Sequence, residues 1–377
     1  MKIAILKEVR DGETRVAATP ETVKKFTGQG DSVVLEAGAG LAAAAPDAAY
    51  VEAGASIAPD AASALKDADL LLKVRRPTEA EIAALKPGAG VVALMAPYAD
   101  KAQFQAYAAR GVDALVMEFI PRITRAQAMD ALSSQANLAG YRAVMEGGAL
   151  YGRAFPMMMT AAGTVAPAKT FIMGVGVAGL QAIATARRLG GVVTATDVRP
   201  ATKEQVTSLG AKFIAVEDEE FKAAETAGGY AKEMSAEYQA KQRALVAAHV
   251  AKQDIVITTA LIPGRAAPVL VTPEMVATMR PGSVIVDLAV EQGGNCPLSK
   301  PDELVVTDNG VRIMGFTNLP GRMAADSSAL YAKNLLNLLP LLRDKETGAY
   351  APAREDDIIK AALAVSGGQV LLPQLAS

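Results

Sequence analysis

The sequence contains very little cysteine and histidine, and this scarcity excludes several kinds of site. Of its 377 residues, one is a cysteine and one is a histidine. The single cysteine, Cys296, rules out a disulfide framework and any metal site built from several thiolates. The single histidine, His249, argues against histidine-ligated zinc, for which two or three histidines are usual. We therefore expect no metal site.

The chain also lacks a charge of one sign and a long uninterrupted apolar run. Its 38 basic and 40 acidic side chains give a formal net charge of −2, without the basic face that nucleic-acid binders usually carry. The longest uncharged stretches, Ala154–Ala168 and Thr170–Ala186, contain Gly or Pro, whereas a membrane-spanning helix needs about 20 apolar residues. Charged side chains follow Met1–Ile5 at once, unlike in a signal peptide. These features predict a soluble, cytoplasmic protein that binds no nucleic acid.

Short β-rich runs alternate with helical patterns in two series, one before and one after the segment Ile123–Phe155. This alternation indicates parallel sheets covered by helices on both faces. We expect an α/β fold with two Rossmann-like, doubly wound parallel-sheet domains and a cleft between them. The expected strands are Lys2–Ile5, Ser32–Glu36, Leu70–Val74, Val91–Met95, Val112–Met117, Thr170–Met173, Val192–Thr196, Lys212–Ala215, Ile255–Thr258, Val284–Asp287 and Arg312–Met314.

The domain boundaries follow from the segments that break this alternation. The segment Ile123–Phe155 predicts a long connecting helix, which Gly140 and Gly147–Gly148 should interrupt or end in parts. The apolar pattern of Ser327–Leu342 predicts a helix that packs back on the first domain, and the tail after it is polar and loosely patterned. We expect a discontinuous first domain of residues 1–134 plus 324–377 and a second domain of residues 135–323.

A glycine-rich turn stands where a predicted strand meets a predicted helix. The strand ending at Met173 runs into a G-x-G-x-x-G pattern formed by Gly174, Gly176 and Gly179. In this pattern the first glycine makes the tight turn, the second lets the backbone approach a pyrophosphate, and the third packs helix against strand. The N–H groups at the start of the helix then face the phosphates. The pattern therefore predicts a dinucleotide site.

An acidic residue ends the next predicted strand, as this type of site requires. Asp197 lies about 20 residues beyond the glycines, where an acid binds the hydroxyls of the adenosine ribose. Its charge would repel the 2′-phosphate of NADP(H), although Arg199 lies close by. We therefore expect NAD(H) as the cofactor of this chain.

Two further loops follow predicted strands at the same edge of the second sheet. Thr258–Gly264 follows the fourth strand, and Val286–Ala289 with Glu291–Gly294 ends the fifth. Ligands of open α/β sheets bind at this carboxyl edge, and a purely structural loop is the alternative. The long charged segment Glu217–Gln253 is either a lid or binding loop, or a longer helical excursion on the surface.

Several blocks of the sequence resemble one family specifically. The residues Lys7–Glu8, Arg15–Ala17, Thr19–Pro20, Lys73–Val74 and Val286–Asp287, with the glycine motif, resemble the alanine dehydrogenase/transhydrogenase superfamily. Four longer blocks resemble the NAD(H)-binding component of proton-translocating nicotinamide nucleotide transhydrogenase, and the resemblance covers nearly the whole chain. These blocks are Pro121–Asp130, Ser133–Val144, Phe155–Thr164 and Glu225–Ala231.

The resemblance implies roles for particular residues. Arg122, Gln127, Asp130 and Ser133 would shape the hydride-transfer site, with Gln127 reaching the nicotinamide of a partner's NADP(H). A capped helix start is the alternative for Asp130 and Ser133, because both residue types are common there. The residues expected to bind NAD(H), with Tyr230 on a loop that closes over it, are Asn137, Leu138, Gly174, Gly176, Val177, Ala178, Gly179, Asp197, Val198, Arg199, Gly229, Tyr230, Thr259, Ala260 and Leu261.

Three functions compete, and the first alternative is an alanine dehydrogenase-like amino-acid dehydrogenase. Oxidative deamination needs a proton acceptor tuned near neutral pH. Relative to alanine dehydrogenases, Val91–Tyr98 lacks the catalytic histidine, Arg75 replaces the substrate lysine, and Glu291 replaces the catalytic aspartate. Arg15 is retained, with a structural role as its alternative, and His249 lies in a helical stretch typical of a packed histidine. The second alternative is a catalytically silent NAD-binding regulatory module.

The favoured function is direct hydride transfer between two nicotinamides, which needs orientation and exclusion of water but no acid or base. Only one complete nucleotide fingerprint is present, so NADP(H) would be bound by a partner subunit. The resemblance further implies a homodimer, and transmembrane subunits that translocate protons. The chain would then be peripheral on the cytoplasmic face of the inner membrane, held there by its partners.

Overall fold

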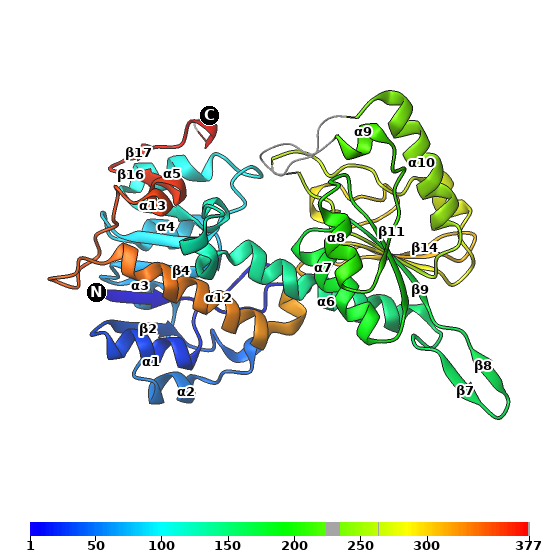
Figure 1. Cartoon of the computed structure of the whole chain (residues 1–377). Helices are drawn as coiled ribbons and strands as arrows, with labels where there is room; N and C mark the ends of the chain where they lie inside the picture. The colour runs from blue at the N-terminus through cyan, green and yellow to red at the C-terminus, as the bar shows by residue number, and fades with distance from the viewer. Residues whose placement is uncertain (224–233, 263, 376–377) are drawn as a thin grey trace. The chain divides into compact units, whose positions relative to one another are not determined.

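The computed structural model describes residues 1–223, 234–262 and 264–375 of the chain. The chain divides into two compact units, unit 1 with Met1–Gln135 and Pro320–Ser377, and unit 2 with Ala136–Leu319. It passes from the first unit to the second within helix α6 (Ala131–Tyr151). Each unit is built around its own mainly parallel sheet, which confirms the predicted α/β fold class (Figure 1).

The sheet of unit 1 has eight strands in the order β17-β16-β6-β5-β4-β1-β2-β3. Strands β1 to β6 are parallel, and β16 and β17 extend the sheet in antiparallel fashion. The chain adds strands outward from β1 and then reverses at β4, so the β1/β4 pair is the topological switch point. The strands are β1 (Lys2–Ile5), β2 (Ser32–Glu36), β3 (Ser56–Ala58), β4 (Leu70–Arg75), β5 (Gly90–Leu94), β6 (Asp113–Val116), β16 (Leu363–Ser366) and β17 (Gln369–Val370).

Helices cover both faces of this sheet because its strands are apolar on both sides. One face packs against α1 (Pro20–Gly28), α2 (Asp47–Glu52), α12 (Ala324–Leu338) and α13 (Asp357–Ala362), with Phe26, Tyr50 and Tyr331 fully buried. The other face packs against α3 (Ala61–Leu65), α4 (Glu79–Ala84) and α5 (Gln103–Arg110). The tail of the chain thus supplies both helices and strands to unit 1.

The sheet of unit 2 has seven strands in the order β11-β10-β9-β12-β13-β15-β14. All pairs are parallel except β14 with β15. The chain again reverses direction, so the β9/β12 pair is the switch point where open α/β sheets bind ligands. The strands are β9 (Lys169–Met173), β10 (Val192–Thr196), β11 (Lys212–Phe213), β12 (Ile255–Thr258), β13 (Val284–Asp287), β14 (Leu304–Val306) and β15 (Arg312–Met314).

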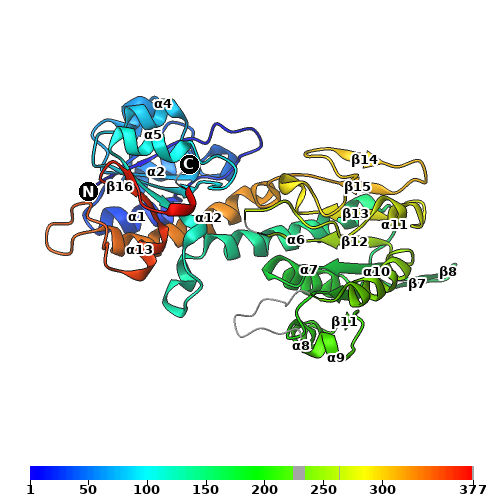
Figure 2. The same cartoon turned by 90° about the horizontal axis from the view of Figure 1, so that it is seen from above.

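The core of unit 2 lies between this sheet and its helices. The helices are α6, α7 (Val177–Arg188), α8 (Thr202–Ser208), α9 (Glu219–Lys222), α10 (Ala236–Val250) and α11 (Pro273–Ala277). A separate hairpin of β7 (Met158–Thr160) and β8 (Gly163–Val165) extends from this unit (Figure 2). Short 3₁₀ helices occupy Leu41–Ala43, Met117–Phe119, Thr124–Met129 (η3), Val290–Gln292, Leu319–Met323, Leu339–Leu342 and Pro373–Leu375.

The structure corrects two sequence-based expectations. Helix α6 runs through Gly140 and Gly147–Gly148 without interruption, because these glycines serve close packing. A Cβ on Gly140 would lie 2.0 Å from the carbonyl oxygen of Ala178 in α7. The tail is not merely loose, because β16 (Leu363–Ser366) is a fully buried strand beside β6. Among the described residues, no helix has the length and apolar character needed to cross a membrane.

Candidate nucleotide-binding site

The glycine-rich turn follows β9 at the switch point of unit 2. Gly174 has a φ of +101°, and a Cβ there would lie 2.5 Å from Oγ1 of Thr259. A Cβ on Gly179 would lie 1.9 Å from the carbonyl oxygen of Gly174, so the start of α7 packs directly against the turn. By contrast, a Cβ on Gly176 would meet nothing within 4 Å. This open space beside the first turn of α7 fits a pyrophosphate approached by backbone.

Asp197 lies directly beside this turn. Its Oδ2 accepts a hydrogen bond from the backbone N–H of Val175 at 2.7 Å, and its Oδ1 accepts one from the backbone N–H of Arg199 at 2.9 Å. The Asp197 side chain is 7% exposed and its carboxylate is therefore held in one orientation. The structure thus brings together the glycine turn and the acid that the sequence placed 18 residues apart from Gly179 to Asp197.

The guanidinium of Arg199 is part of the same cluster. Its Nε donates to Oδ1 of Asp197 at 2.9 Å, and its Nη2 donates to Oδ2 at 3.0 Å and to the carbonyl of Val175 at 3.2 Å. The hydrogen bond and charge of Asp197 raise the pKa of Arg199 above its ordinary value. The proximity of Arg199 to Asp197, noted in the sequence, is therefore a bidentate ion pair.

The loop after β12 completes the edge of the site. Thr259 donates from Oγ1 to the carbonyl of Gly174 at 3.1 Å, and its backbone N–H donates to the carbonyl of Met173 at 2.9 Å. The next residue, Ala260, is held by the buried Asn295, whose Oδ1 accepts from its N–H at 3.0 Å and whose Nδ2 donates to its carbonyl at 2.9 Å. Asn295 was missed in the sequence, although a polar residue just after Gly293–Gly294 at the same edge was a usable signal.

The loop after β13 is held by its own aspartate. The buried Asp287 accepts from the N–H groups of Ala289 and Cys296, both at 3.0 Å, and from Oγ of Ser299 at 2.7 Å. Glu291 in this loop is exposed and accepts from the backbone N–H of Asn318 at 3.1 Å. The contacts of Asp287 are those of a structural loop, which was the alternative considered for this segment.

Helix α6 brings two further predicted residues toward α7. Asn137 is exposed, and its Nδ2 donates to Oε1 of Gln181 in α7 at 3.4 Å. Leu138 is half-buried one residue further along the helix. The close approach of Gly140 to Ala178 fixes this arrangement.

The remaining predicted residues of unit 2 vary in exposure. Val177 begins α7 and is 38% exposed, whereas Val198 and Leu261 are 67% and 49% exposed. Such apolar side chains at a nucleotide edge can cover a ligand. Gly229 and Tyr230, expected on a closing loop, lie outside the described residues.

The four residues expected to shape the hydride-transfer site lie in unit 1, in and around η3. Arg122 and Gln127 are exposed. Asp130 and Ser133 form a helix cap, in which Oδ1 of Asp130 accepts from the Ser133 N–H at 2.8 Å and Oδ2 accepts from its Oγ at 2.6 Å. The structural alternative for these two residues is thus realised, and a cap still leaves the carboxylate half-buried at the start of α6.

The segment containing these residues is anchored by the C-terminal region of unit 1. Asn334 of α12 donates from Nδ2 to the carbonyl of Ala128 at 2.9 Å, and its Oδ1 accepts from Oγ of Ser134 at 2.7 Å. The guanidinium of Arg125 binds both oxygens of Asp356 at 2.8 and 2.7 Å. Neither anchor was recognised in the sequence, although Asn334 stands out as a polar residue on the buried face of an apolar helix.

The switch point of unit 1 contains buried charges that bind one another. Oε1 of Glu8 accepts from the backbone N–H of Val74 at 2.7 Å. Nζ of Lys73 donates to Oε1 of Glu81 at 2.9 Å and lies 3.8 Å from Oε2 of Glu8. Burial raises the pKa of Glu8 to about 7, against the attraction of Lys73. Among the described residues, Oε2 of Glu8 has no hydrogen-bond partner.

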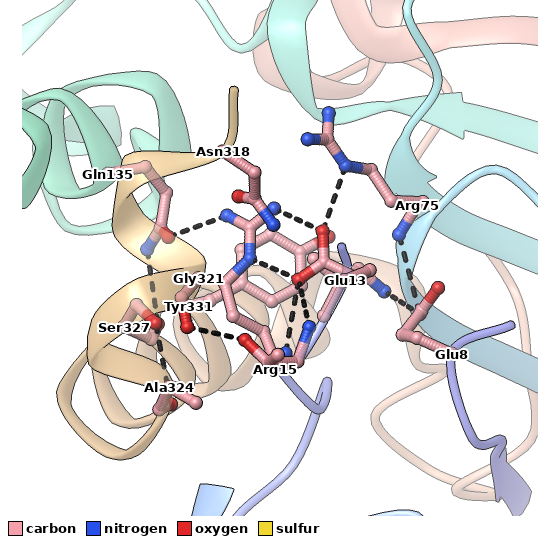
Figure 3. A network of polar contacts seen from close by, with 12 residues as sticks. Glu8, Glu13, Arg15, Arg75, Gln135, Asn318, Gly321, Ala324, Ser327 and Tyr331 are labelled. Carbon is pink, nitrogen blue, oxygen red and sulfur yellow. Dashed lines mark hydrogen bonds and ion pairs between the residues drawn. The ribbon is translucent and has the colours of Figure 1, made fainter. Parts of the chain in front are cut away.

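A second buried ion pair lies next to this one (Figure 3). Arg15 donates from Nε and Nη2 to the two oxygens of Glu13 at 2.7 and 2.6 Å, and from Nη1 to Oε1 of Gln135 at 2.8 Å. Nε of Arg75 also donates to Glu13, at 2.9 Å. Although burial favours the protonated form, the hydrogen bonds and charge of Arg15 and the charge of Arg75 lower the pKa of Glu13 to about 2. The guanidinium of Arg15 is therefore engaged inside the protein.

The single histidine is a packed residue of unit 2. Nε2 of His249 lies 2.8 Å from Oγ1 of Thr194 and 3.1 Å from Nε2 of Gln253, and its ring packs edge-on against Phe171. Burial lowers its pKa. These contacts agree with the interpretation of His249 as a structural residue.

Comparison with known proteins gives the family. The model described as "Alanine dehydrogenase/PNT, N-terminal domain" matches residues 4–139, and "Alanine dehydrogenase/PNT, C-terminal domain" matches residues 143–373. The first of the separately named parts of the NAD(P) transhydrogenase subunit alpha of Rhodospirillum rubrum is 56% identical over 380 residues, covering 100% of this chain and 99% of that one. The NAD(P) transhydrogenase subunit alpha of Cereibacter sphaeroides is 46% identical, covering 99% of this chain and 71% of that one.

A solved structure agrees with these relatives. The transhydrogenase from Sinorhizobium meliloti matches with a TM-score of 0.90 and 54% sequence identity, covering 98% of this chain and 100% of that one. The resemblance inferred from the blocks around Pro121–Val144 and the glycine motif is thereby confirmed. The chain belongs to the alanine dehydrogenase/PNT family, among the relatives named as alpha subunits of NAD(P) transhydrogenase.

Proposed function

We propose that this chain is the NAD(H)-binding subunit of a proton-translocating transhydrogenase. Hydride passes directly between NAD(H) bound in unit 2 and NADP(H) bound on a partner subunit. The observation that carries the nucleotide portion of this proposal is the hydrogen bond from the Val175 N–H to Asp197, which holds the acid beside the glycine turn. The names of the relatives from Rhodospirillum rubrum and Cereibacter sphaeroides support the assignment as a transhydrogenase.

The residues around the glycine turn would hold NAD(H). The pyrophosphate would lie at Gly176, where a Cβ would meet no atom within 4 Å and the first N–H groups of α7 are available. Asp197 would accept hydrogen bonds from the adenosine ribose and disfavour a 2′-phosphate. The loop of Thr259, Ala260 and Leu261 would border the cofactor, and Gly229–Tyr230 would close over it.

The hydride-transfer segment of unit 1 would supply orientation. NAD(H), when bound, supplies the hydride carried on its nicotinamide. Arg122 and Gln127 are exposed and would contact the nicotinamide groups, while Asp130 and Ser133 hold the start of α6 in place. Anchoring of this segment by Asn334 and Asp356 supports a positioning role, since the reaction needs aligned carbons and no proton transfer.

The internal pairing of Arg15 argues against an amino-acid dehydrogenase. Such an enzyme needs a cation free to bind the substrate carboxylate. Arg15 is 2% exposed, and its guanidinium binds Glu13 and Gln135 instead. A carboxylate substrate would have to displace Glu13 from a buried bidentate pair.

Partners and location belong to the same proposal. We infer a homodimer that docks on an NADP(H)-binding component, with proton translocation carried out by transmembrane subunits. Coupling between the two processes would act through nucleotide-dependent conformations of the complex. The chain would be peripheral on the cytoplasmic face of the inner membrane.

Mixing the purified chain with an NADP(H)-binding partner tests the function. Hydride transfer from NADH to an NADP⁺ analogue is followed spectroscopically, and Gln127→Ala is expected to slow it about 100-fold by misplacing the reacting groups. Gln105→Ala, which removes another exposed glutamine of unit 1, is the matched control and should leave the rate unchanged.

The alternatives predict different outcomes of the same experiment. Oxidation of NADH by pyruvate and ammonia without any partner would indicate an amino-acid dehydrogenase. Binding of NADH without either activity would indicate the regulatory module. Equal rates for Gln127→Ala and Gln105→Ala would remove Gln127 from the hydride-transfer site.

A further inference from the structure

Every hydrogen-bonding position on the carboxylate of Asp197 is taken in this structure. Each oxygen of a carboxylate has about two lone-pair sites. Oδ1 accepts from the backbone N–H and from Nε of Arg199, both at 2.9 Å. Oδ2 accepts from the backbone N–H of Val175 at 2.7 Å and from Nη2 of Arg199 at 3.0 Å. No lone pair is left for the two ribose hydroxyls that such an acid has to accept.

The four donors differ in how easily they can leave. The two backbone N–H groups belong to the glycine turn and to the chain just after β10, so they hold the carboxylate in place permanently. The other two belong to the guanidinium of Arg199, whose side chain is 37% exposed and carries rotatable bonds. The guanidinium is therefore the group that occupies the two positions a ribose would need.

The charge of Arg199 also changes what Asp197 can exclude. A carboxylate bound to a guanidinium in a bidentate pair presents little net charge to its surroundings. Discrimination against a 2′-phosphate by Asp197 depends on an uncompensated negative charge. An arginine that leaves the carboxylate yet stays nearby would soften this discrimination.

We propose that Arg199 is a specificity-determining residue that competes with the adenosine ribose for Asp197. NAD(H) binds by displacing the Arg199 guanidinium from Oδ1 and Oδ2, and the two backbone N–H groups keep the carboxylate aimed at the ribose. Arg199 thus weakens NAD(H) binding, which favours exchange of the nucleotide, and it reduces the penalty for NADP(H). This proposal rests on the proposed binding of NAD(H) in unit 2.

Equilibrium binding of NADH and NADPH to the full chain tests the competition. Arg199→Met keeps the aliphatic stem and removes every donor. It should bind NADH about two- to fivefold more tightly, because a partly exposed ion pair that must be broken is worth up to about 1 kcal/mol. The same variant should bind NADPH about two- to fivefold more weakly, because Asp197 then keeps its full charge.

Two further variants guard the interpretation. Arg199→Lys keeps the positive charge but cannot bind both oxygens at once, so its NADH affinity should lie between those of the unchanged chain and Arg199→Met. Arg142→Gln removes another arginine–carboxylate pair of unit 2, with Glu146, at a similar exposure of 32%. It should leave both affinities unchanged.

The outcomes are distinct. Unchanged or weaker NADH binding by a folded Arg199→Met, compared with Arg142→Gln, overturns the competition. So does a crystal structure of the NADH complex in which the guanidinium still binds both oxygens of Asp197. Absence of NADH binding by the unchanged chain overturns the proposed function, and the role of Arg199 with it. NADH binding that tightens in Arg199→Met supports the role of Arg199 even if no hydride transfer is found.

Discussion

The two units share one strand order and use it differently. In each, six strands follow the doubly wound pattern, with switch points at β1/β4 in unit 1 and β9/β12 in unit 2. In unit 2 the chain leaves β9 through glycines, and a Cβ on Gly176 would meet open space. In unit 1 the chain leaves β1 toward Glu8, whose carboxylate binds the N–H of Val74 near the end of β4.

This difference shows that the architecture alone does not make a ligand site. The switch point of a parallel sheet exposes backbone groups that need partners. In unit 1 buried side chains, chiefly Glu8, Glu13 and Arg15, supply those partners and bind one another. In unit 2 the helix α7 begins with Gly176 and its first N–H groups remain available to a ligand. We expect unit 1 to respond to substitution in stability and unit 2 in binding.

The largest effect is expected from Arg15→Gln, which breaks the buried pair of unit 1. Glu13 would keep Arg75 as its remaining cation, while its buried carboxylate loses two hydrogen bonds. The free energy of unfolding should fall by about 3–5 kcal/mol, the usual cost of an uncompensated buried charge. Urea denaturation measures this loss. A stability within about 1 kcal/mol of the unchanged chain, on the scale of an exposed pair, would contradict the closed nature of this edge.

A smaller effect is expected from pH, through Glu8. Its pKa rises from the ordinary 4.5 to about 7 in the folded chain. Between these values the folded chain keeps a proton that the unfolded chain has lost, so the free energy of unfolding should fall as pH rises, by up to about 3 kcal/mol. The lowered pKa of Glu13 acts in a different window, since its stabilisation is lost only as pH falls from 4.5 toward about 2.

The variant Glu8→Gln isolates this contribution. It should remove the decline in stability between pH 4.5 and 7, measured by urea denaturation at several pH values. Glu21→Gln, at an exposed carboxyl with a lowered pKa, should retain the decline. An identical slope in both variants would mean that Glu8 is not the titrating group.

Gly176→Ala is expected to affect unit 2 in binding alone. The added methyl group meets no protein atom within 4 Å, so the melting temperature should stay unchanged. The same group would stand where the backbone approaches the pyrophosphate, so NADH affinity should fall about tenfold or more, or at least about 1.4 kcal/mol. Gly28→Ala, which also adds a methyl group in open space, is the control in unit 1. Equal NADH affinity in both variants would place the pyrophosphate elsewhere.

The smallest effect is expected from Arg125→Gln. Arg125 binds Asp356 through two hydrogen bonds, like Arg15 with Glu13, but its side chain is 49% exposed. Its loss should cost less than about 1 kcal/mol of stability. Measured beside Arg15→Gln, it tests whether burial rather than geometry sets the strength of these pairs. A cost as large as that of Arg15→Gln would show that the anchor on η3 matters more than burial implies.

Local sequence patterns were enough for the fold class and for the nucleotide motif. The eleven expected strands are all present, because each is a short apolar run bounded by turn residues. The roles assigned to Gly174 and Gly179 depend on contacts close in the chain, and the structure agrees with them. The continuity of α6 through Gly140 was not foreseen, because only the packing of α7 explains that glycine.

Other features depended on residues distant in the sequence. The sequence by itself determined where strands end, where glycines permit a turn and that an acid follows, since these are properties of short segments. Only the tertiary structure decided that β16 joins the sheet of unit 1, that Asn334 and Asp356 anchor η3, and that Arg199 saturates Asp197. Such pairings depend on the distance between side chains in space and on their burial, which a one-dimensional pattern does not encode.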